Sequence, residues 1–203
     1  MPKTPDATRR SDRSRRAILD AALALVGEVG YNKLTIEAIA ARAGVGKQTI
    51  YRWWPSKAAV LLDASLALAG DAETEAEWTG FPDSGDLAAD LKHVLRATVD
   101  EFNDEKYDAP ARALTAAGAT DPELGARFTE QLLEPQLALY EARLHAAREA
   151  GQLAPDTDLR LTVEMLLGPL TYRWLLRTAP LTHAYTDALV DGVLGGVANV
   201  TDR

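Results

Sequence analysis

The chain has 203 residues, of which 47% are hydrophobic and 26% charged, and its formal net charge is −8. A chain of this length can bury a hydrophobic core as one or two domains. It contains no cysteine, which excludes disulfides, thiolate metal sites and cysteine nucleophiles. No apolar run follows the basic N-terminus, and the most apolar later stretch is too short to span a bilayer. We therefore expect a cytoplasmic protein with no signal peptide and no membrane partner.

The charge is distributed unevenly along the chain. Residues 1–57 contain 11 Lys and Arg against 5 Asp and Glu, a net charge of +6, whereas residues 58–203 have a net charge of −14. This asymmetry is typical of a protein whose one end meets nucleic-acid phosphates. A basic tail on an acidic, solvated body would have the same charges, so charge alone leaves both interpretations open.

Helical periodicity recurs from one end of the chain to the other, and no alternating strand pattern is present, which predicts an all-α fold. The first helix is predicted over residues 12–29 and ends at Gly30. Its apolar stripe consists of Ile18, Ala22, Leu25, Val26 and Val29. One such stripe predicts a helix with a single buried face.

Two short helices are predicted next, on either side of a glycine turn. Thr35 is expected to cap the second helix, although Glu37 stands one position too early for a capping box. The turn at residues 44–46 leads into a third helix over 47–54, and a Pro-Ser pair then begins a fourth helix over 56–68.

The remaining chain is predicted to form a loop and a series of longer helices. Periodicity fades over residues 70–85, where acidic residues, glycine and proline accumulate, which predicts a loop. The helical stretches that follow are predicted at residues 86–102, 110–117, 122–150, 158–179 and 182–199. Pro135 is expected to kink or split the third of them, and Gly168-Pro169 to kink the fourth. The predicted organisation is a basic flexible arm (1–11), a helix-turn-helix domain (12–55) and a larger helical body (56–203).

The segment 35–57 has the composition of a DNA-reading helix-turn-helix. Ile50 and Trp54 share one face of its second helix and can pack inward, while the opposite polar arc can meet base edges in a major groove. The residues predicted to contact DNA from this arc are Lys47, Gln48, Thr49, Tyr51, Arg52 and Trp53. Thr35 and Lys57 begin the neighbouring helices, where free amides favour a phosphate. An ordinary three-helix subdomain has the same periodicity, but the turn, the aromatic-basic helix and the charge together favour DNA.

Residues 12–60 resemble the DNA-binding domain of the tetracycline-repressor (TetR), AcrR-type, family of bacterial transcriptional regulators. The matching residues are Ala21-Ala22, Thr35-Ile36, Ile39-Ala40, Ala43-Gly44-Val45 and the run KQTIYRWWPSK at 47–57. The chain departs from the family at Gly46 (usually Ser or Thr), at Arg52-Trp53 (often including His) and at Trp54 (usually Phe). The remainder, including GPLTYRWLLRTAPLT at 168–182, is similar to one common C-terminal subtype.

The resemblance implies a homodimer that binds a palindromic double-stranded DNA operator, most often as a repressor, and is released by a small-molecule effector in the regulatory and dimerisation body. It also implies that the last two helices pair with those of a second copy. The dimer interface is then expected at Leu166, Leu170, Leu189, Val193, Leu194 and Val197. The effector is expected near His93, Phe102, Tyr107, Tyr140, Met165, Tyr172 and Trp174. Burial in a monomeric core would also account for these residues.

Two further classes of protein remain as alternatives. An enzyme is disfavoured because no Ser-His-Asp signature, phosphate-binding glycine loop or HExxH motif is present. An architectural DNA protein would spread basic residues over its surface, whereas here they concentrate in residues 1–57. His93, His145 and His183 have no ligand-type spacing with carboxylates, so we expect no metal and no cofactor.

Overall fold

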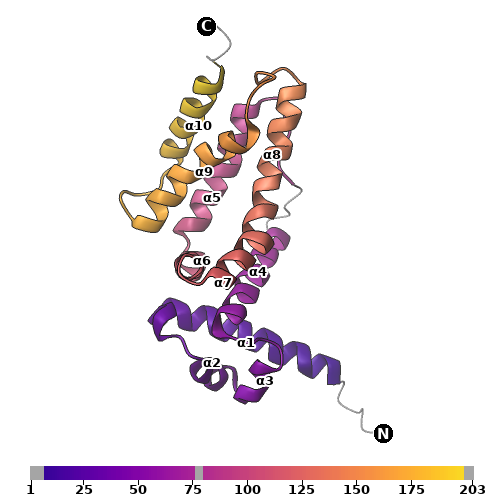
Figure 1. Ribbon diagram of the computed structural model, residues 1–203, viewed down its shortest axis with the longest axis vertical. Helices are drawn as coiled ribbons and strands as arrows, with labels where there is room; N and C mark the ends of the chain where they lie inside the picture. Colours follow the sequence, from indigo (N-terminus) through magenta and orange to yellow (C-terminus); the bar gives the residue numbers. More distant parts are fainter. Residues whose placement is uncertain (1–6, 76–79, 199–203) are drawn as a thin grey trace. The chain divides into compact units, whose positions relative to one another are not determined.

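The computed structural model describes residues 7–75 and 80–198 of the chain. Side chains are described throughout these stretches except at residues 7–10, 69, 71–75 and 197–198. Every regular element within them is helical, which confirms the predicted all-α fold (Figure 1). No helix in the described part of the chain is long and apolar enough to cross a membrane.

The helices form two compact units that are both discontinuous in sequence. Unit 1 consists of Met1–Glu77 with Lys106–Thr129, and unit 2 consists of Trp78–Glu105 with Glu130–Arg203. This division differs from the predicted boundary after residue 55, because the chain returns to unit 1 for residues 106–129 before it completes unit 2. Unit 1 therefore contains residues from the middle of the chain in addition to the N-terminal helices.

Unit 1 contains the predicted N-terminal helices and two helices from the middle of the chain. They are α1 (Ala7–Val29), the 3-10 turn η1 (Tyr31–Lys33), α2 (Ile36–Ala43), α3 (Lys47–Tyr51), α4 (Lys57–Glu75), α6 (Glu105–Gly118) and α7 (Pro122–Phe128). Helix α4 continues to Glu75, so the prediction of a loop from residue 70 was wrong for residues 70–75. Pro110 lies inside α6, which begins one and a half turns earlier than predicted.

The core of unit 1 forms where α1 packs against α2 and α4. Ile18, Ile39 and Leu61, one from each of these helices, are completely buried. Val29 is 42% exposed, so the apolar stripe predicted on α1 ends before this residue. This core holds the short helix α2 in place against the longer α1 and α4, since short helices gain most of their stability from tertiary packing.

Two glycines let α6 and α7 approach closely. A Cβ atom added to Gly125 would come within 2.6 Å of the carbonyl oxygen of Gly118, whereas a Cβ on Gly118 would meet Gly125 at 3.5 Å. A side chain at Gly125 would therefore push the two backbones apart. The close approach fixes the α6–α7 pair, and α7 in turn contacts α4.

Unit 2 is a helical bundle (Figure 1). Its elements are α5 (Leu87–Asn103), the π-helical turn η2 (Thr129–Leu133), α8 (Glu134–Glu149), α9 (Leu159–Leu176) and α10 (His183–Ala198). Asp86 and Asp158 cap α5 and α9, where their carboxylates accept from the amides of Ala89 and Leu161. The predicted stretch 122–150 is split into α7, η2 and α8 just before Pro135, as the proline suggested.

A buried ion pair lies beside the apolar core of unit 2. Arg143 of α8 donates to one carboxylate oxygen of Asp90 on α5 through Nε at 3.0 Å and Nη2 at 2.8 Å, and it also donates to the carbonyl of Pro82. Ser84 donates to the same carboxylate through its backbone amide and its hydroxyl. Burial raises the pKa of Asp90, but the hydrogen bonds from Ser84 and Arg143 outweigh it and leave the pKa below its usual value. The pair therefore fastens α5, α8 and the segment before α5 to one another.

Ion pairs in register also join α5 to α10. The partners are four residues apart on each helix, and the two helices are antiparallel at this contact. The ion pairs are Lys92 with Asp191 and Arg96 with Asp187, and a hydrogen bond between Asp100 Oδ1 and His183 Nε2 continues the row. Because they lie on the solvent side of the contact, they fix the register of α10 more than they add to stability.

Candidate nucleic-acid interface

The helix-turn-helix is formed by α2, the glycine turn and α3. Thr35 caps α2, as predicted, because its hydroxyl accepts from the amide of Ala38 at 3.1 Å. Gly44 ends α2 with a φ of 66°, a left-handed conformation that favours glycine, and the amide of Val45 donates back to the carbonyl of Ala40. Gly46 begins α3 without a side-chain cap, which is the consequence of its departure from the Ser or Thr usual in the family.

Helix α3 is seated by two buried residues, as the sequence predicts. Ile50 is completely buried and Trp54 nearly so. The indole Nε1 of Trp54 also donates to Oδ2 of Asp63 on α4 at 2.8 Å. Arg15 of α1 reaches the same carboxylate oxygen at 3.2 Å. A phenylalanine at position 54 could not make this bond, so the departure from the family connects α3 directly to α4.

The side chains predicted to read DNA lie on the outer side of α3 or directly after it. Lys47, Gln48, Tyr51 and Arg52 are exposed, whereas Thr49 and Trp53 are half-buried. The guanidinium of Arg52 lies over the ring of Trp53, 4.9 Å from its centroid, and Trp53 meets Trp54 edge-on. The indole of Trp53 therefore supports Arg52 at the surface, and the structure brings the predicted readers of α3 together.

Lys57 has partners within unit 1. Its ammonium donates to the carbonyl oxygens of Tyr31 and Leu34, both at 2.9 Å, and lies 4.4 Å from the centroid of the Tyr31 ring. These bonds fix the connection between α1 and α2. The phosphate contact predicted for Lys57 stays a prediction, and the residue also holds the helix-turn-helix together.

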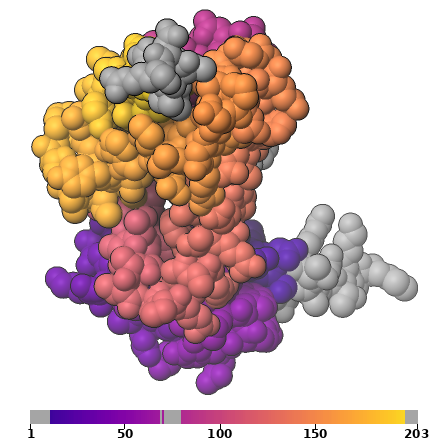
Figure 2. Space-filling model, turned by 45° about the horizontal axis from the view of Figure 1, so that its top comes forward, coloured from indigo at the N-terminus to yellow at the C-terminus, as the bar shows by residue number. Residues whose placement is uncertain are grey.

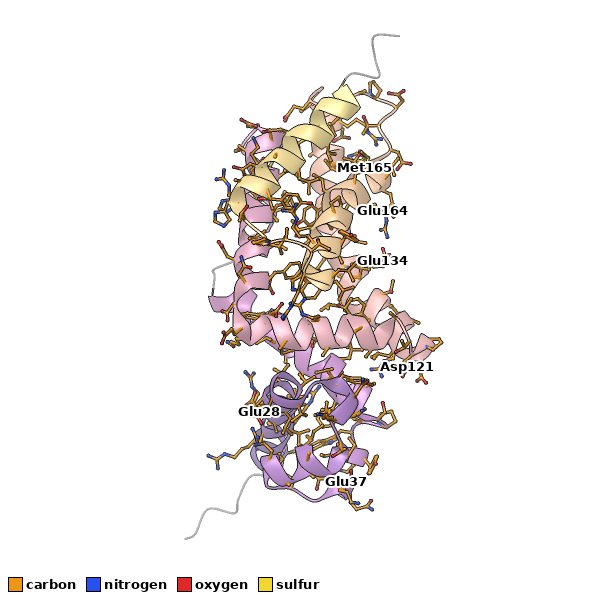
Figure 3. All side chains as sticks on the ribbon, turned by 90° about the vertical axis from the view of Figure 1, so that its left-hand side faces the viewer. Glu28, Glu37, Asp121, Glu134, Glu164 and Met165 are labelled. Atoms are coloured by element: carbon orange, nitrogen blue, oxygen red, sulfur yellow. The ribbon has the colours of Figure 1, made fainter. Side chains whose placement is uncertain are left out.

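Two acidic residues of this region were not among the predicted site residues. Asp63 could not be found from the sequence, since its contact with Trp54 joins two different helices. Glu37 pairs with Lys47 at 3.1 Å, and it lies at the end of unit 1 shown at the bottom of Figure 3. A hydrogen bond from its own backbone amide and the pairing with Lys47 lower the pKa of Glu37. The sequence drew attention to Glu37 only as an acidic residue that stands one position too early for a capping box.

The residues predicted to line an effector site are not gathered in one place. Phe102 and Trp174 stack at 4.4 Å, and Tyr140 is buried edge-on against Phe81, where burial raises the pKa of Tyr140 to about 12. His93, Met165 and Tyr172 are exposed, and Tyr107 belongs to unit 1. Phe102, Tyr140 and Trp174 make aromatic contacts within unit 2, and the effector site predicted at the seven residues stays a prediction.

The residues predicted to form a dimer interface lie mainly in the core of their own chain. Leu166, Leu170 and Val193 are buried, while Leu189 and Leu194 are half-buried against that core. The side chain of Val197 lies outside the described residues. Leu166, Leu170 and Val193 are thus already packed inside one chain, whereas Leu189 and Leu194 keep part of their surface open, and the interface predicted at these residues stays a prediction.

Helix α9 instead exposes a different apolar stripe. Its members recur at helical spacing and are Leu161, Met165, Tyr172 and Leu176. Met165 is 43% and Tyr172 58% exposed. Figure 2 shows α9 and α10, coloured orange to yellow, forming much of one face of unit 2. Helix α9 therefore has two apolar faces, one packed in the core around Leu166 and one exposed around Met165.

Helices α2 and α3 are joined by a glycine turn, and α3 exposes polar and cationic side chains. This arrangement defines the helix-turn-helix class of DNA-binding proteins. The chain matches the family model "Bacterial regulatory proteins, tetR family" over residues 18–64 and the model "Tetracyclin repressor-like, C-terminal domain" over residues 81–193. The protein belongs to the tetR family of transcriptional regulators.

Relatives and solved structures agree with this assignment. The chain is 30% identical over 189 residues to the HTH-type transcriptional regulator YdeS of Bacillus subtilis, covering 93% of this chain and 91% of that protein. It is 31% identical to the DNA-binding transcriptional repressor TetR of Mycobacteroides abscessus, covering 91% and 94% of the two chains. The crystal structure of the TetR family regulator SCO0332 is 35% identical with a TM-score of 0.70, covering 91% of this chain and 98% of that one. These relatives are transcriptional regulators and not enzymes, and regulators of the family bind DNA operators, dimerise and bind small-molecule effectors.

Proposed function

We propose that the protein is a ligand-responsive repressor that binds a palindromic operator as a homodimer through its helix-turn-helix. The observation that carries this proposal is the outer side of α3, where Lys47, Gln48, Tyr51 and Arg52 are exposed beside each other in sequence. These side chains supply the donors and acceptors that base edges in a major groove require, and two of them add positive charge for phosphates.

Dimer formation is supported by the exposed apolar stripe on α9. A soluble helix that exposes two leucines, a methionine and a tyrosine at helical spacing is commonly covered by a partner. A second copy of the same chain is the simplest partner, since two-fold symmetric dimers are the commonest oligomers. Two copies would present two α3 helices to half-sites about 34–36 Å apart, or a multiple of that distance.

Effector release is supported by the way the chain passes between its units. The chain passes from one unit to the other after residues 77, 105 and 129, so α6 and α7 of unit 1 are joined directly to α5 and α8 of unit 2. An organic effector that separates the aromatic side chains of unit 2, such as the Phe102–Trp174 stack, would move these connections. A coupling of about 1–3 kcal/mol between the two sites would be enough to lower operator affinity strongly.

The relatives support a small organic effector but do not specify it. One solved structure of 25% identity is titled a flavonoid-responsive regulator. The relative from M. abscessus is named a repressor, which supports repression over activation. We therefore propose an effector with an apolar or aromatic part, consistent with the aromatic groups inside unit 2.

The proposal is tested by footprinting the protein on the DNA that flanks its own gene and then on the protected duplex alone. We expect protection of a palindrome, and we expect Gln48→Ala to cost about 1–3 kcal/mol of binding free energy, mainly at one base position of each half-site. Gln136→Ala on α8 of unit 2 changes an exposed side chain of the same kind, is the control and should leave binding unchanged.

Binding that is equal on all duplexes would contradict this function. If Gln48→Ala also weakened every duplex to the same degree, the architectural DNA protein would be the better description, since its contacts would be to phosphates alone.

A further inference from the structure

The Glu37–Lys47 ion pair places a carboxylate at the proposed DNA surface. Lys47 is the first residue of α3, and Glu37 lies in the first turn of α2. Lys47 Nζ and Glu37 Oε1 are 3.1 Å apart, and the two side chains are 54% and 62% exposed. The pair therefore lies at the surface with both groups open to solvent.

Glu37 is favoured in the first turn of α2 without any partner, and its pairing with Lys47 adds little to folding. Exposed ion pairs contribute little to stability, because the two charges are solvated and screened before they meet. A carboxylate near a DNA surface also repels phosphates and removes part of the benefit of the lysine beside it. A feature that adds little to stability and weakens general DNA affinity is best explained by a contact that only one kind of base pair provides.

The hydrogen-bonding pattern of the pair indicates which base pair that is. Lys47 presents an ammonium donor, and Glu37 presents a carboxylate acceptor whose Oε1 lies 3.1 Å from Lys47 Nζ. In the major groove a C·G pair presents the reverse, the guanine O6 acceptor beside the cytosine N4 donor, and these two atoms are themselves one hydrogen bond apart. A T·A pair also sets an acceptor, thymine O4, beside a donor, adenine N6, but lysine is matched to guanine O6 and N7 and glutamate to cytosine N4.

We propose that Glu37 and Lys47 act together as the reader of one C·G pair in each half-site, with Lys47 donating to guanine O6 or N7 and Glu37 accepting from cytosine N4. This inference rests on the proposed function, since it deepens the role of the same helix-turn-helix. Glu37 is thereby a specificity-determining residue, supplied by α2 and not by the recognition helix. At sites without the C·G pair, its charge lowers affinity.

The chain provides a matched control in the same unit. Glu28 at the end of α1 and Arg42 in the last turn of α2 form an ion pair of similar exposure. Their contact is bidentate, at 2.9 and 2.8 Å, so the carboxylate and the guanidinium satisfy each other on both sides. Figure 3 labels Glu28 and Glu37 on different parts of unit 1. Replacing Glu28 thus removes the same charge without removing the proposed reader.

The test is a selection from a random double-stranded DNA library, carried out in parallel with the wild type, Glu37→Ala and Glu28→Ala. We expect the wild type and Glu28→Ala to select the same palindrome, with one C·G position in each half-site that Glu37→Ala specifies less strongly because only the Lys47 contact to guanine is left. Replacing that pair by T·A in the selected duplex should weaken wild-type binding about 5- to 150-fold, the range for one good base contact, and weaken Glu37→Ala less than about 3-fold. Thermal unfolding of both variants should match the wild type, because both pairs are exposed.

The outcomes separate this inference from the proposed function. If Glu37→Ala keeps the full C·G preference at every position, Glu37 reads no base and the inference is wrong while the repressor stands. If the wild type itself selects no sequence, the proposed function fails and the inference fails with it. A loss of preference in Glu28→Ala equal to that in Glu37→Ala would mean that surface charge, and not a base contact, sets the selection.

Discussion

The two units expose opposite kinds of surface. In unit 1 the outer residues of α3 are polar or cationic, and the apolar residues of the same helix are buried. In unit 2 helix α9 buries one apolar face in the core and exposes a second one. Cationic donors suit phosphates and base edges, whereas an exposed apolar stripe suits another protein surface. The difference agrees with the proposed function, in which unit 1 meets DNA and unit 2 meets a second copy.

The units also differ in how they use ion pairs. The described pairs of unit 1 are partly or largely exposed, and one of them, Asp63 with Arg15, takes part in seating α3 through Trp54. Unit 2 has a fully buried pair, Asp90 with Arg143, between α5 and α8. A buried pair holds its helices in one arrangement, whereas the side chains of exposed pairs can change partners when DNA binds. The following variants are chosen to break or sharpen this contrast.

The largest effect is expected from Arg143→Ala in unit 2. The change leaves the Asp90 carboxylate buried without its cation, which should lower the free energy of unfolding by about 3–5 kcal/mol. Arg160→Ala is the control, since Arg160 bridges the exposed carboxylates of Glu134, Glu141 and Glu164. The control should cost about 1 kcal/mol or less. Chemical unfolding followed by circular dichroism measures the free energy of unfolding of both variants. If the two variants lost the same amount, the buried pair would be no more important to stability than the exposed ones.

A smaller but decisive effect is expected from Met165→Asp on the α9 stripe. A carboxylate at the centre of an apolar interface should make the free energy of dimer formation less favourable by about 2–4 kcal/mol, enough to give monomers at micromolar concentration. Val29→Asp changes a residue of equal exposure in unit 1 and should leave the dimer intact. Sedimentation velocity distinguishes the two variants. An unchanged mass for Met165→Asp would mean that the interface lies elsewhere.

The smallest effect on stability is expected from Asp63→Ala in unit 1. It leaves the indole N–H of Trp54 without its acceptor and should cost about 1–3 kcal/mol of unfolding free energy, with an additional loss of operator affinity because α3 is less firmly held. Asp63→Asn keeps an oxygen acceptor and should restore most of both quantities. If Asn rescues stability but not DNA binding, the charge that Asp63 offers to Arg15 matters more than the bond to Trp54.

Local signals in the sequence predicted most of the fold. Periodicity predicted nearly every helix, and the cap at Thr35 lies where its side chain suggested, because capping involves residues three apart. Burial of Ile50 and Trp54 followed from the same periodicity. These features depend on neighbours in the chain, so a single sequence is enough to predict them.

Contacts between distant residues could not be predicted in the same way. The assignment of α6 and α7 to unit 1 depends on a close approach at Gly125 and on contacts with α4, and nothing in residues 105–128 indicates which unit covers them. The two apolar faces of α9 are alike in composition, so the sequence could not tell the core face of Leu166 from the open face of Met165. The bond from Trp54 to Asp63 depends on the crossing of two helices.

The most direct test of the contrast between the units is the mass of the protein–DNA complex, measured by native mass spectrometry on the duplex selected by the wild type. We expect an even number of chains on each palindromic duplex, with Met165→Asp reducing this to one chain on an isolated half-site at much lower affinity. A single wild-type chain on the full duplex would contradict the claim that unit 1 reads DNA while unit 2 pairs two copies.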